Sequence, residues 1–213
     1  MARHPVPRSA ARAGALVALG LGAALLTRRL AQTWGTLGGE HDDELPGDGI
    51  LPDARLVATR GVGIAAPPRV IWPWLLQLGY GRGGFYSHDR LERLAGLDIR
   101  SAERVEERWQ GLAVGDEVHL APAVALSVAE MHPERHLVLA GVHSGPGKAP
   151  APYDFTWAFV LRPVGAGSRV LVRERYRPRG PGGRVLAEVM QPVSFVMTAA
   201  MLRGIRQRTL NTS

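Results

Sequence analysis

A chain of 213 residues, 46% apolar and 21% charged, has the length and composition of a globular protein of one domain with an appendage. It contains no cysteine, which excludes disulfides, thiolate catalysis and cysteine-based zinc or iron–sulfur sites. The net charge of +7 is concentrated at the two ends, with five arginines and no acid in residues 1–33 and eight arginines against two glutamates from Arg173 onward. Such ends suit anionic lipid or a solvated helix face, and because no nucleic-acid-binding motif accompanies them we expect no nucleic-acid partner.

The first element is an uncharged run from Ala13 to Thr27, flanked by Arg12 and Arg28. As a helix it would span about 22 Å, short of the roughly 30 Å of a hydrocarbon core, although flanking arginines can extend toward the interfaces. Arginines follow the run where a signal peptide has its small-residue cleavage site. We therefore expect residues 1–33 to be an uncleaved membrane anchor, with a disordered leader as the alternative, on a protein that is otherwise cytoplasmic.

Residues 34–53 are rich in glycine, proline and acid, and are expected to form a linker or extended lead-in to a domain over 54–213. This domain opens with a strand at 56–64. A proline-rich helix start at Pro67 and Pro68 follows, with an apolar helical stripe up to about Gln77. A glycine-rich turn at 79–84 then leads to a second short helix at 87–94.

The rest of the domain alternates between strand-like segments and turn residues until a final helix. The predicted strands are 103–109, 116–121, 124–131, 136–142, 153–162 and 168–177. Helical spacing returns over 182–208, where Pro192 should kink or break the helix. This order predicts an α+β helix-grip fold, in which a curved antiparallel sheet wraps around a long C-terminal helix and leaves a cavity suited to an apolar ligand.

Several segments resemble the SRPBCC superfamily, which contains START lipid-transfer domains, birch-pollen-allergen-like proteins and polyketide cyclases. The stretch Ala65-Ala66-Pro67-Pro68-Arg69-Val70-Ile71-Trp72-Pro73-Trp74-Leu75 resembles the start of the first helix in that superfamily. The segment Arg82 to Ser87 with Asp89 and Leu91, the pair Gly115-Asp116, and Trp157 with Phe159 resemble an uncharacterised bacterial branch. The resemblance covers about residues 54–208 and implies the helix-grip fold and a binding cavity, but little about ligand or chemistry.

Strand periodicity selects the side chains expected to face the cavity. Tyr153, Phe155, Trp157, Phe159 and Leu161 share one face of their strand, where they form either the cavity floor or packing against the last helix. Glu174 shares a face with the valines of the next strand, and Arg60 shares one with the apolar residues of the first strand. Because first and last strands are neighbours in this fold, we predict an inward-facing ion pair between Arg60 and Glu174, with a β-bulge that turns either residue outward as the alternative.

Two apparent motifs are discounted. Residues 79–84 match G-x-G-x-x-G literally, but a helix and not a strand precedes them, so a tight turn is favoured over a nucleotide site. His132 and His136 do not form the helical H-E-x-x-H pattern, and Pro133 favours a turn between strands in which the two imidazoles need not converge. We expect no metal and no cofactor.

These patterns favour a carrier, sensor or sequestering protein for a lipid-like or aromatic small molecule over an enzyme. The alternatives are a polyketide cyclase or dehydratase-like enzyme, for which only Glu174, Asp89, Tyr86 and His88 offer acid–base groups, and a membrane-tethered interaction module. The catalytic residues are left unassigned and the oligomeric state is not indicated. The residues expected to line the ligand cavity are Arg60, Trp72, Trp74, Arg82, Phe85, Tyr86, Asp89, Trp157, Phe159, Glu174, Tyr176 and Met197.

Overall fold

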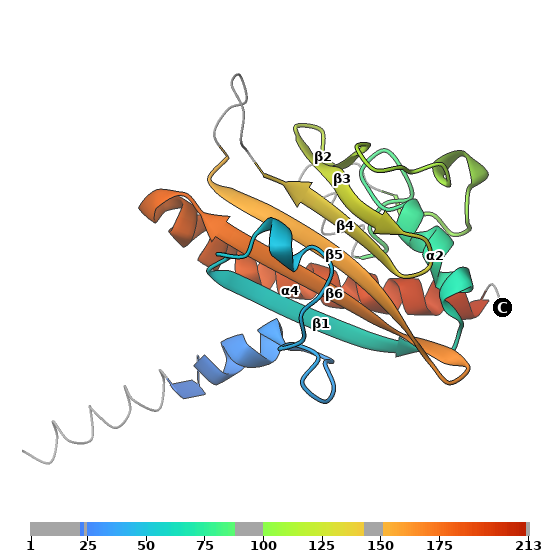
Figure 1. Ribbon diagram of the computed structural model, residues 1–213, viewed down its shortest axis with the longest axis horizontal. Coiled ribbons are helices and arrows are strands. Elements are labelled where there is room, and N and C mark those ends of the chain that lie inside the picture. Colours follow the sequence, from blue (N-terminus) through green and yellow to red (C-terminus); the bar gives the residue numbers. More distant parts are fainter. Residues whose placement is uncertain (1–21, 24, 88–99, 143–150, 212–213) are drawn as a thin grey trace, which may run out of the picture.

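One antiparallel sheet organises the protein, and its edge is the first predicted strand. In the computed structural model, which describes residues 22–23, 25–87, 100–142 and 151–211, β1 (Leu56–Ile64) pairs with β6 (Gly167–Pro178). The strand order is β1-β6-β5-β4-β3-β2, so the first and last strands in sequence are neighbours, as expected (Figure 1). The other strands are β2 (Glu117–Ala121), β3 (Val124–His132), β4 (His136–Gly141) and β5 (Tyr153–Val164).

The long helix α4 (Gly180–Asn211) lies along one face of this sheet (Figure 1). It continues as a helix through Pro192, so the predicted break does not occur. Its C-terminal half is the better buried, through Ala199, Met201, Leu202 and Ile205. Within the described residues α4 is the one helix with the length and apolar composition of a membrane span, and 33% of that apolar window is buried inside the protein.

Helix α2 (Pro68–Leu76) closes one end of the space between the sheet and α4. Proline at its first position has a fixed φ that suits a helix start, and its buried side chains include Ile71, Trp74 and Leu75. These side chains join a single apolar core with Leu139, Phe159 and Val172 of the sheet and Met201 of α4. The second short helix, predicted at 87–94, lies almost wholly outside the described residues.

The strand predicted at 103–109 is wrong. This segment is a loop that ends in one 3-10 turn, Glu107–Trp109. Its sequence carries alternating charges with too few apolar side chains to cover a sheet face. Gln77 holds the loop instead, since its side-chain amide donates to the carbonyl of Arg104 (3.2 Å) and accepts from the backbone N–H of Glu106 (3.0 Å).

Residues 34–53, expected as a linker or lead-in, run along the outer face of the sheet, opposite α4 (Figure 1). We call this segment the strap. Leu45 packs against Val160 and Leu171 on that outer face, and Leu51 is fully buried. The described residues 22, 23 and 25–32 before it are helical; we call them the N-terminal helix.

Candidate functional site

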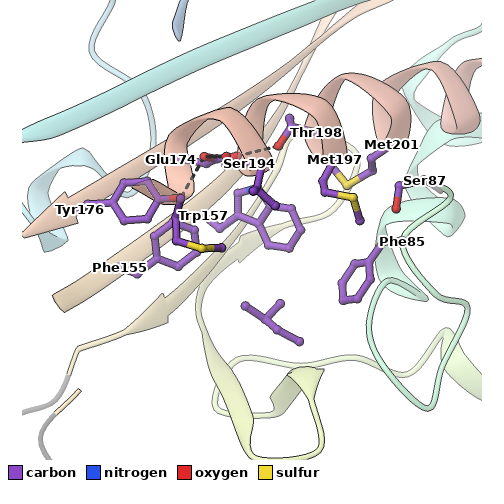
Figure 2. A pocket seen from close by; sticks show the side chains of 13 residues that line it. Phe85, Ser87, Phe155, Trp157, Glu174, Tyr176, Ser194, Met197, Thr198 and Met201 are labelled. Carbon is purple, nitrogen blue, oxygen red and sulfur yellow. Dashed lines mark hydrogen bonds between the residues drawn. The ribbon is translucent and has the colours of Figure 1, made fainter. Parts of the chain in front are cut away.

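A cavity of about 290 Å³ lies between the sheet and the middle of α4. Phe155, Trp157 and Tyr176 form its sheet wall, while the helix contributes three methionines (Figure 2). Phe85, from the loop after α2, faces Trp157 at a ring-centroid distance of 6.2 Å. The full lining comprises Phe85, Ser87, Leu120, Phe155, Trp157, Glu174, Tyr176, Met190, Val193, Ser194, Met197, Thr198 and Met201.

Apart from Ser87, the polar side chains of the cavity gather at one wall, where Glu174 is buried at the centre of a hydrogen-bond network. Its Oε1 accepts from Arg60 Nη1 at 2.9 Å and from Thr198 Oγ1 at 2.6 Å. Its Oε2 accepts from the Tyr176 hydroxyl at 3.1 Å and from the Ser194 hydroxyl. Four donors therefore occupy a carboxylate that has about four lone-pair sites, which keeps the buried charge satisfied.

The predicted ion pair between Arg60 and Glu174 is confirmed. Both side chains are almost wholly buried, at 1% and 3% exposure. The register of β1 against β6 places Arg60 opposite Val172 and Ala58 opposite Glu174, so the two side chains meet diagonally on the face toward α4. Strand parity was sufficient for this prediction because neither strand carries a bulge between the two residues.

The charge of Glu174 acts on the neighbouring phenols. Burial, followed by the carboxylate charge, raises the pKa of Tyr176 well above its ordinary value. The same two causes raise the pKa of Tyr153, whose ring lies 5.4 Å from that of Tyr176. The Tyr176 hydroxyl therefore stays protonated and acts as a donor to Glu174.

The structure brings together five of the predicted lining residues at this cavity: Phe85, Trp157, Glu174, Tyr176 and Met197. Arg60 stands behind Glu174 and its guanidinium lies toward the N-terminal helix, where Nε donates to the carbonyl of Ala31 (2.9 Å). Asp89 and His88 lie outside the described residues.

Trp72, Trp74 and Phe159 lie in the packed core. The aromatic face of β5 is divided along its length, since Phe155 and Trp157 line the cavity whereas Phe159 is fully buried. Trp74 is likewise fully buried on α2, with its ring in a T-shaped contact with Tyr86. The alternation of side chains along a strand identifies the face on which a residue lies, but not how far it is from the cavity. These three rings fill the core next to the cavity and do not line it.

Arg82 and Tyr86 serve as structural ties near α2. Arg82 Nη2 donates to the carbonyls of Leu76 and Trp109, each at 2.9 Å, which fixes the end of the helix to the following loop. The Tyr86 hydroxyl donates to the carbonyl of Trp74 at 3.1 Å. Gly79 and Gly84, both at positive φ, pair their backbones across a tight turn, so the glycine-rich stretch is a turn after a helix, as predicted.

Of the polar and flexible residues that α4 contributes, only Met197 was predicted. Met190, Ser194, Met197, Thr198 and Met201 fall at helical spacing and share one face, so this signal was present in the sequence. Two hydroxyls within an otherwise apolar stripe mark a place where the helix meets a polar group. That group is Glu174.

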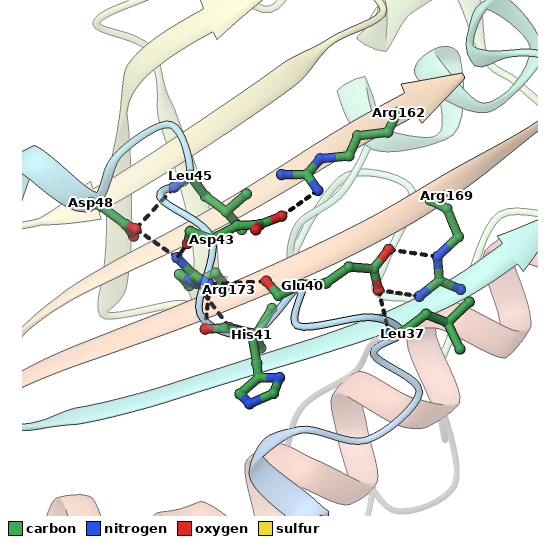
Figure 3. Close-up of polar contacts among 10 residues, drawn as sticks. Leu37, Glu40, His41, Asp43, Leu45, Asp48, Arg162, Arg169 and Arg173 are labelled. Carbon is green, nitrogen blue, oxygen red and sulfur yellow. Dashed lines mark hydrogen bonds and ion pairs between the residues drawn. The ribbon is translucent and has the colours of Figure 1, made fainter. Parts of the chain in front are cut away.

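The basic C-terminal region is largely compensated inside the protein. Arg169 and Arg173 of β6 face outward and bind the strap (Figure 3). Arg175 of the same strand also pairs with Asp48 of the strap. Arg173, only 3% exposed, pairs with Asp48 at 2.6 Å and donates to the carbonyls of His41 and Asp43. The positive charge of these β6 arginines is thus balanced by the acidic residues of the strap, which is folded against the strand.

His132 and His136 lie opposite each other across the turn between β3 and β4, with ring centroids 6.0 Å apart. Burial lowers the pKa of His136 against the opposing effect of Glu130. Within the described part of the chain, no group of three or more metal-binding side chains assembles there or elsewhere.

Neither a protein-family model nor a curated protein sequence matches this chain. Solved structures do. A crystal structure of a Nitrosomonas europaea protein has 14% identity and a TM-score of 0.45, over 74% of this chain and 96% of that one. A Thermus thermophilus protein has 18% identity and a TM-score of 0.41, over 74% and 99%. Ara h 8.0201 has 16% identity and a TM-score of 0.41, over 73% and 98%.

The fold itself is defined by the topology. Six antiparallel strands in the order β1-β6-β5-β4-β3-β2, with the first and last strands adjacent, hold a C-terminal helix of 32 residues against one face. This topology, an antiparallel sheet packed on a long C-terminal helix, is a helix-grip fold.

Proposed function

We propose that the protein binds a compact hydrophobic small molecule in the cavity between the sheet and α4, as a carrier, sensor or sequestering protein. The observation that carries this proposal is the cavity itself, whose mostly apolar walls enclose open space between the sheet and α4. Its volume of about 290 Å³ is near the lower end of the range of about 300–1,000 Å³ that is common for small-molecule sites. Methionines on the helix side suit such a site because their flexible thioethers adapt to different ligand shapes.

One polar contact is available to the ligand. The indole Nε1–H of Trp157, a cavity residue, is buried and has no acceptor among the described residues. A carbonyl, ether or hydroxyl oxygen on the ligand would satisfy this donor. Glu174 is saturated by its four donors, which supports an anchoring role for this carboxylate over proton transfer.

Filling the cavity tests the proposal. Met197→Trp places an indole in the hollow, whereas Val189→Trp, two turns earlier on an exposed part of α4, is the matched control. Titration with the neutral aromatic dye N-phenyl-1-naphthylamine should show at least tenfold weaker binding for Met197→Trp and unchanged binding for Val189→Trp. Native mass spectrometry of the purified protein would identify a co-purified molecule. Equal dye binding by a folded Met197→Trp variant and the wild type would refute the cavity as the site.

We propose in addition that residues 13–27 hold the domain at a membrane. In the described part of the chain, the apolar character of this run continues into Leu25, Leu26 and Leu30, each more than 60% exposed. Large apolar side chains exposed together on one helix are costly in water and stabilising in a bilayer.

Liposome flotation of the full chain tests this tether. The double substitution Leu25→Asp and Leu26→Asp should reduce the bound fraction severalfold, because carboxylates oppose insertion at the end of the apolar run. Leu37→Asp is the control, since Leu37 is equally exposed but lies in the strap. Flotation that is unaffected by the double substitution would contradict the proposal.

A further inference from the structure

A second hollow, of about 620 Å³, lies between the N-terminal helix and α4. Leu30, Ala31 and Trp34 form one wall, and Pro192 and Phe195 of α4 form the other. We call it the cleft. It is distinct from the cavity because the buried ion pair separates the two: Glu174 lines the cavity, whereas Arg60 lines the cleft.

Buried polar groups without partners point to a ligand in this cleft. Arg60 is fully buried, and although Nε and Nη1 are bonded, Nη2 has no acceptor among the described residues. Gln191, also in the lining and 7% exposed, has neither an acceptor for Nε2 nor a donor for Oε1 within the same residues. A buried polar group without a partner destabilises the folded state, so a chain retains several in one place when something else binds them.

The charges around the cleft indicate what kind of head group fits. Arg60 is already neutralised by Glu174 at 2.9 Å, and Arg28 at the cleft rim by Glu188 at 3.0 Å. A carboxylate bound beside Arg60 would therefore face the charge of Glu174 without an excess cation to offset it. Two free donors and one free acceptor instead match a neutral head group that carries both a carbonyl and a hydroxyl.

We propose that the cleft binds a neutral amphiphile with one acyl chain and a carbonyl- and hydroxyl-bearing head group, of which a monoacylglycerol is the simplest example. Arg60 Nη2 and Gln191 Nε2 donate to head-group oxygens, and Gln191 Oε1 accepts from a hydroxyl. The acyl chain packs along Leu30, Trp34 and Phe195. This site is independent of the ligand proposed for the cavity, and it exists only while the N-terminal helix lies against α4.

A brominated probe can locate the amphiphile, because bromine quenches the fluorescence of an indole that it contacts. Trp34 lines the cleft and Trp157 lines the cavity, so each site has its own reporter. The full chain is titrated with 1-(9,10-dibromostearoyl)glycerol. We expect quenching in the wild type and in Trp157→Phe, and loss of most of it in Trp34→Phe.

The head-group contacts are tested with Gln191→Leu, which removes the amide nitrogen and oxygen and keeps a side chain of similar size. We expect about tenfold weaker binding of the probe, while Gln207→Leu, on an exposed part of the same helix, binds as the wild type does. This arm also separates the cleft from a detergent micelle around the N-terminal segment, since quenching within a micelle would not depend on Gln191. Dibromostearate should bind more weakly than its glycerol ester.

Three results would overturn the proposal. Quenching that disappears in Trp157→Phe and persists in Trp34→Phe would place the amphiphile in the cavity, which would leave the proposed function of the cavity intact. Wild-type affinity in a folded Gln191→Leu variant would mean that the free amide groups bind only water. Tighter binding of dibromostearate than of the ester would contradict the neutral head group.

Discussion

At the scale of single residues, Glu174 has the most demanding environment. It is a buried anion whose energy depends on Arg60 and three hydroxyls, drawn from β1, β6 and α4. Removing one partner of a buried ion pair is costly because the other charge stays in a poorly solvated place. The edge strand β1 and the helix α4 are therefore both hydrogen-bonded to the Glu174 carboxylate at the cavity wall.

Glu174→Gln should lower the free energy of unfolding by about 3–5 kcal/mol, because Arg60 would stay buried without an anionic partner. The double variant Arg60→Met with Glu174→Leu should recover much of this loss by removing both charges. Urea unfolding of the two variants and the wild type measures the difference. A loss below about 1 kcal/mol in Glu174→Gln would show that water reaches the pair and screens it.

Prediction from the sequence succeeded for the face of a strand on which a residue lies. It failed for whether an inward-facing residue lines the cavity or lies in the core. Arg60, Glu174 and Trp157 point inward as predicted, because side chains alternate strictly along an unbroken strand. Trp74 was expected at the cavity but lies in the core, since nothing local distinguishes an aromatic ring that lines a hollow from one that fills it. The unpaired amide of Gln191 could not be predicted either, because the cleft around it is formed by the N-terminal helix, β1 and α4, which are distant in sequence.

At the scale of elements, the strap is the segment whose role depends most on tertiary contacts. Its glycine- and proline-rich sequence indicates irregular backbone, which the structure has, but its acids pair with arginines more than 100 residues later (Figure 3). Glu40 is the clearest case, since it receives two hydrogen bonds from Arg169, at 2.9 and 2.6 Å. Such pairing has no signal in local composition.

Glu40 should make the attachment of the strap sensitive to acid. Partial burial would raise the pKa of Glu40, but the hydrogen bonds from Arg169 and the Leu37 N–H outweigh it and hold the pKa below the ordinary value of 4.5. A carboxyl group whose pKa is lowered by folding stabilises the folded state above its unfolded pKa, and this contribution is lost as the pH falls through the folded-state pKa. The stabilising contribution of Glu40 is therefore complete at pH 7 and decreases below about pH 4.5.

Thermal unfolding of Glu40→Gln from pH 7 to pH 3 measures this effect. A loss of about 1 kcal/mol would lower the midpoint by about 2–4 °C in a chain of this size. The difference from the wild type should be present at pH 7 and shrink toward zero at pH 3. Asp42→Asn, at a side chain that is 81% exposed, should show no difference at either pH. A midpoint difference for Glu40→Gln that is constant with pH would rule out this carboxylate as the source.

At the scale of the whole molecule, the order of the elements was enough to predict the fold. A strand, a helix, a run of antiparallel strands and one long helix have few ways to bury their apolar faces, and the helix-grip arrangement satisfies them together. The net charge was a poorer guide. The arginines of β6 are matched by the strap, so a high total charge does not produce an equally basic surface on the sheet.

The strap also determines what unfolds as one unit. If it belongs to the cooperative core, a substitution within it should destabilise the whole domain. Leu51→Ala removes a fully buried side chain on the outer face of the sheet and should lower the free energy of unfolding by about 2–5 kcal/mol. Leu37→Ala, in the same segment but 61% exposed, should change it by no more than about 0.5 kcal/mol.

Urea unfolding followed by far-UV circular dichroism and by tryptophan fluorescence distinguishes the two arrangements. With Trp34 at the start of the strap and four other tryptophans in the domain, coincident transitions are expected in both variants, since a two-state domain loses all its structure together. A separate early transition, or a Leu51→Ala variant as stable as the wild type, would mean that the strap detaches while the sheet stays folded. The arginines of β6 would then become a strongly basic outer face, and the protein should bind anionic liposomes more strongly in that intermediate state than in the native one.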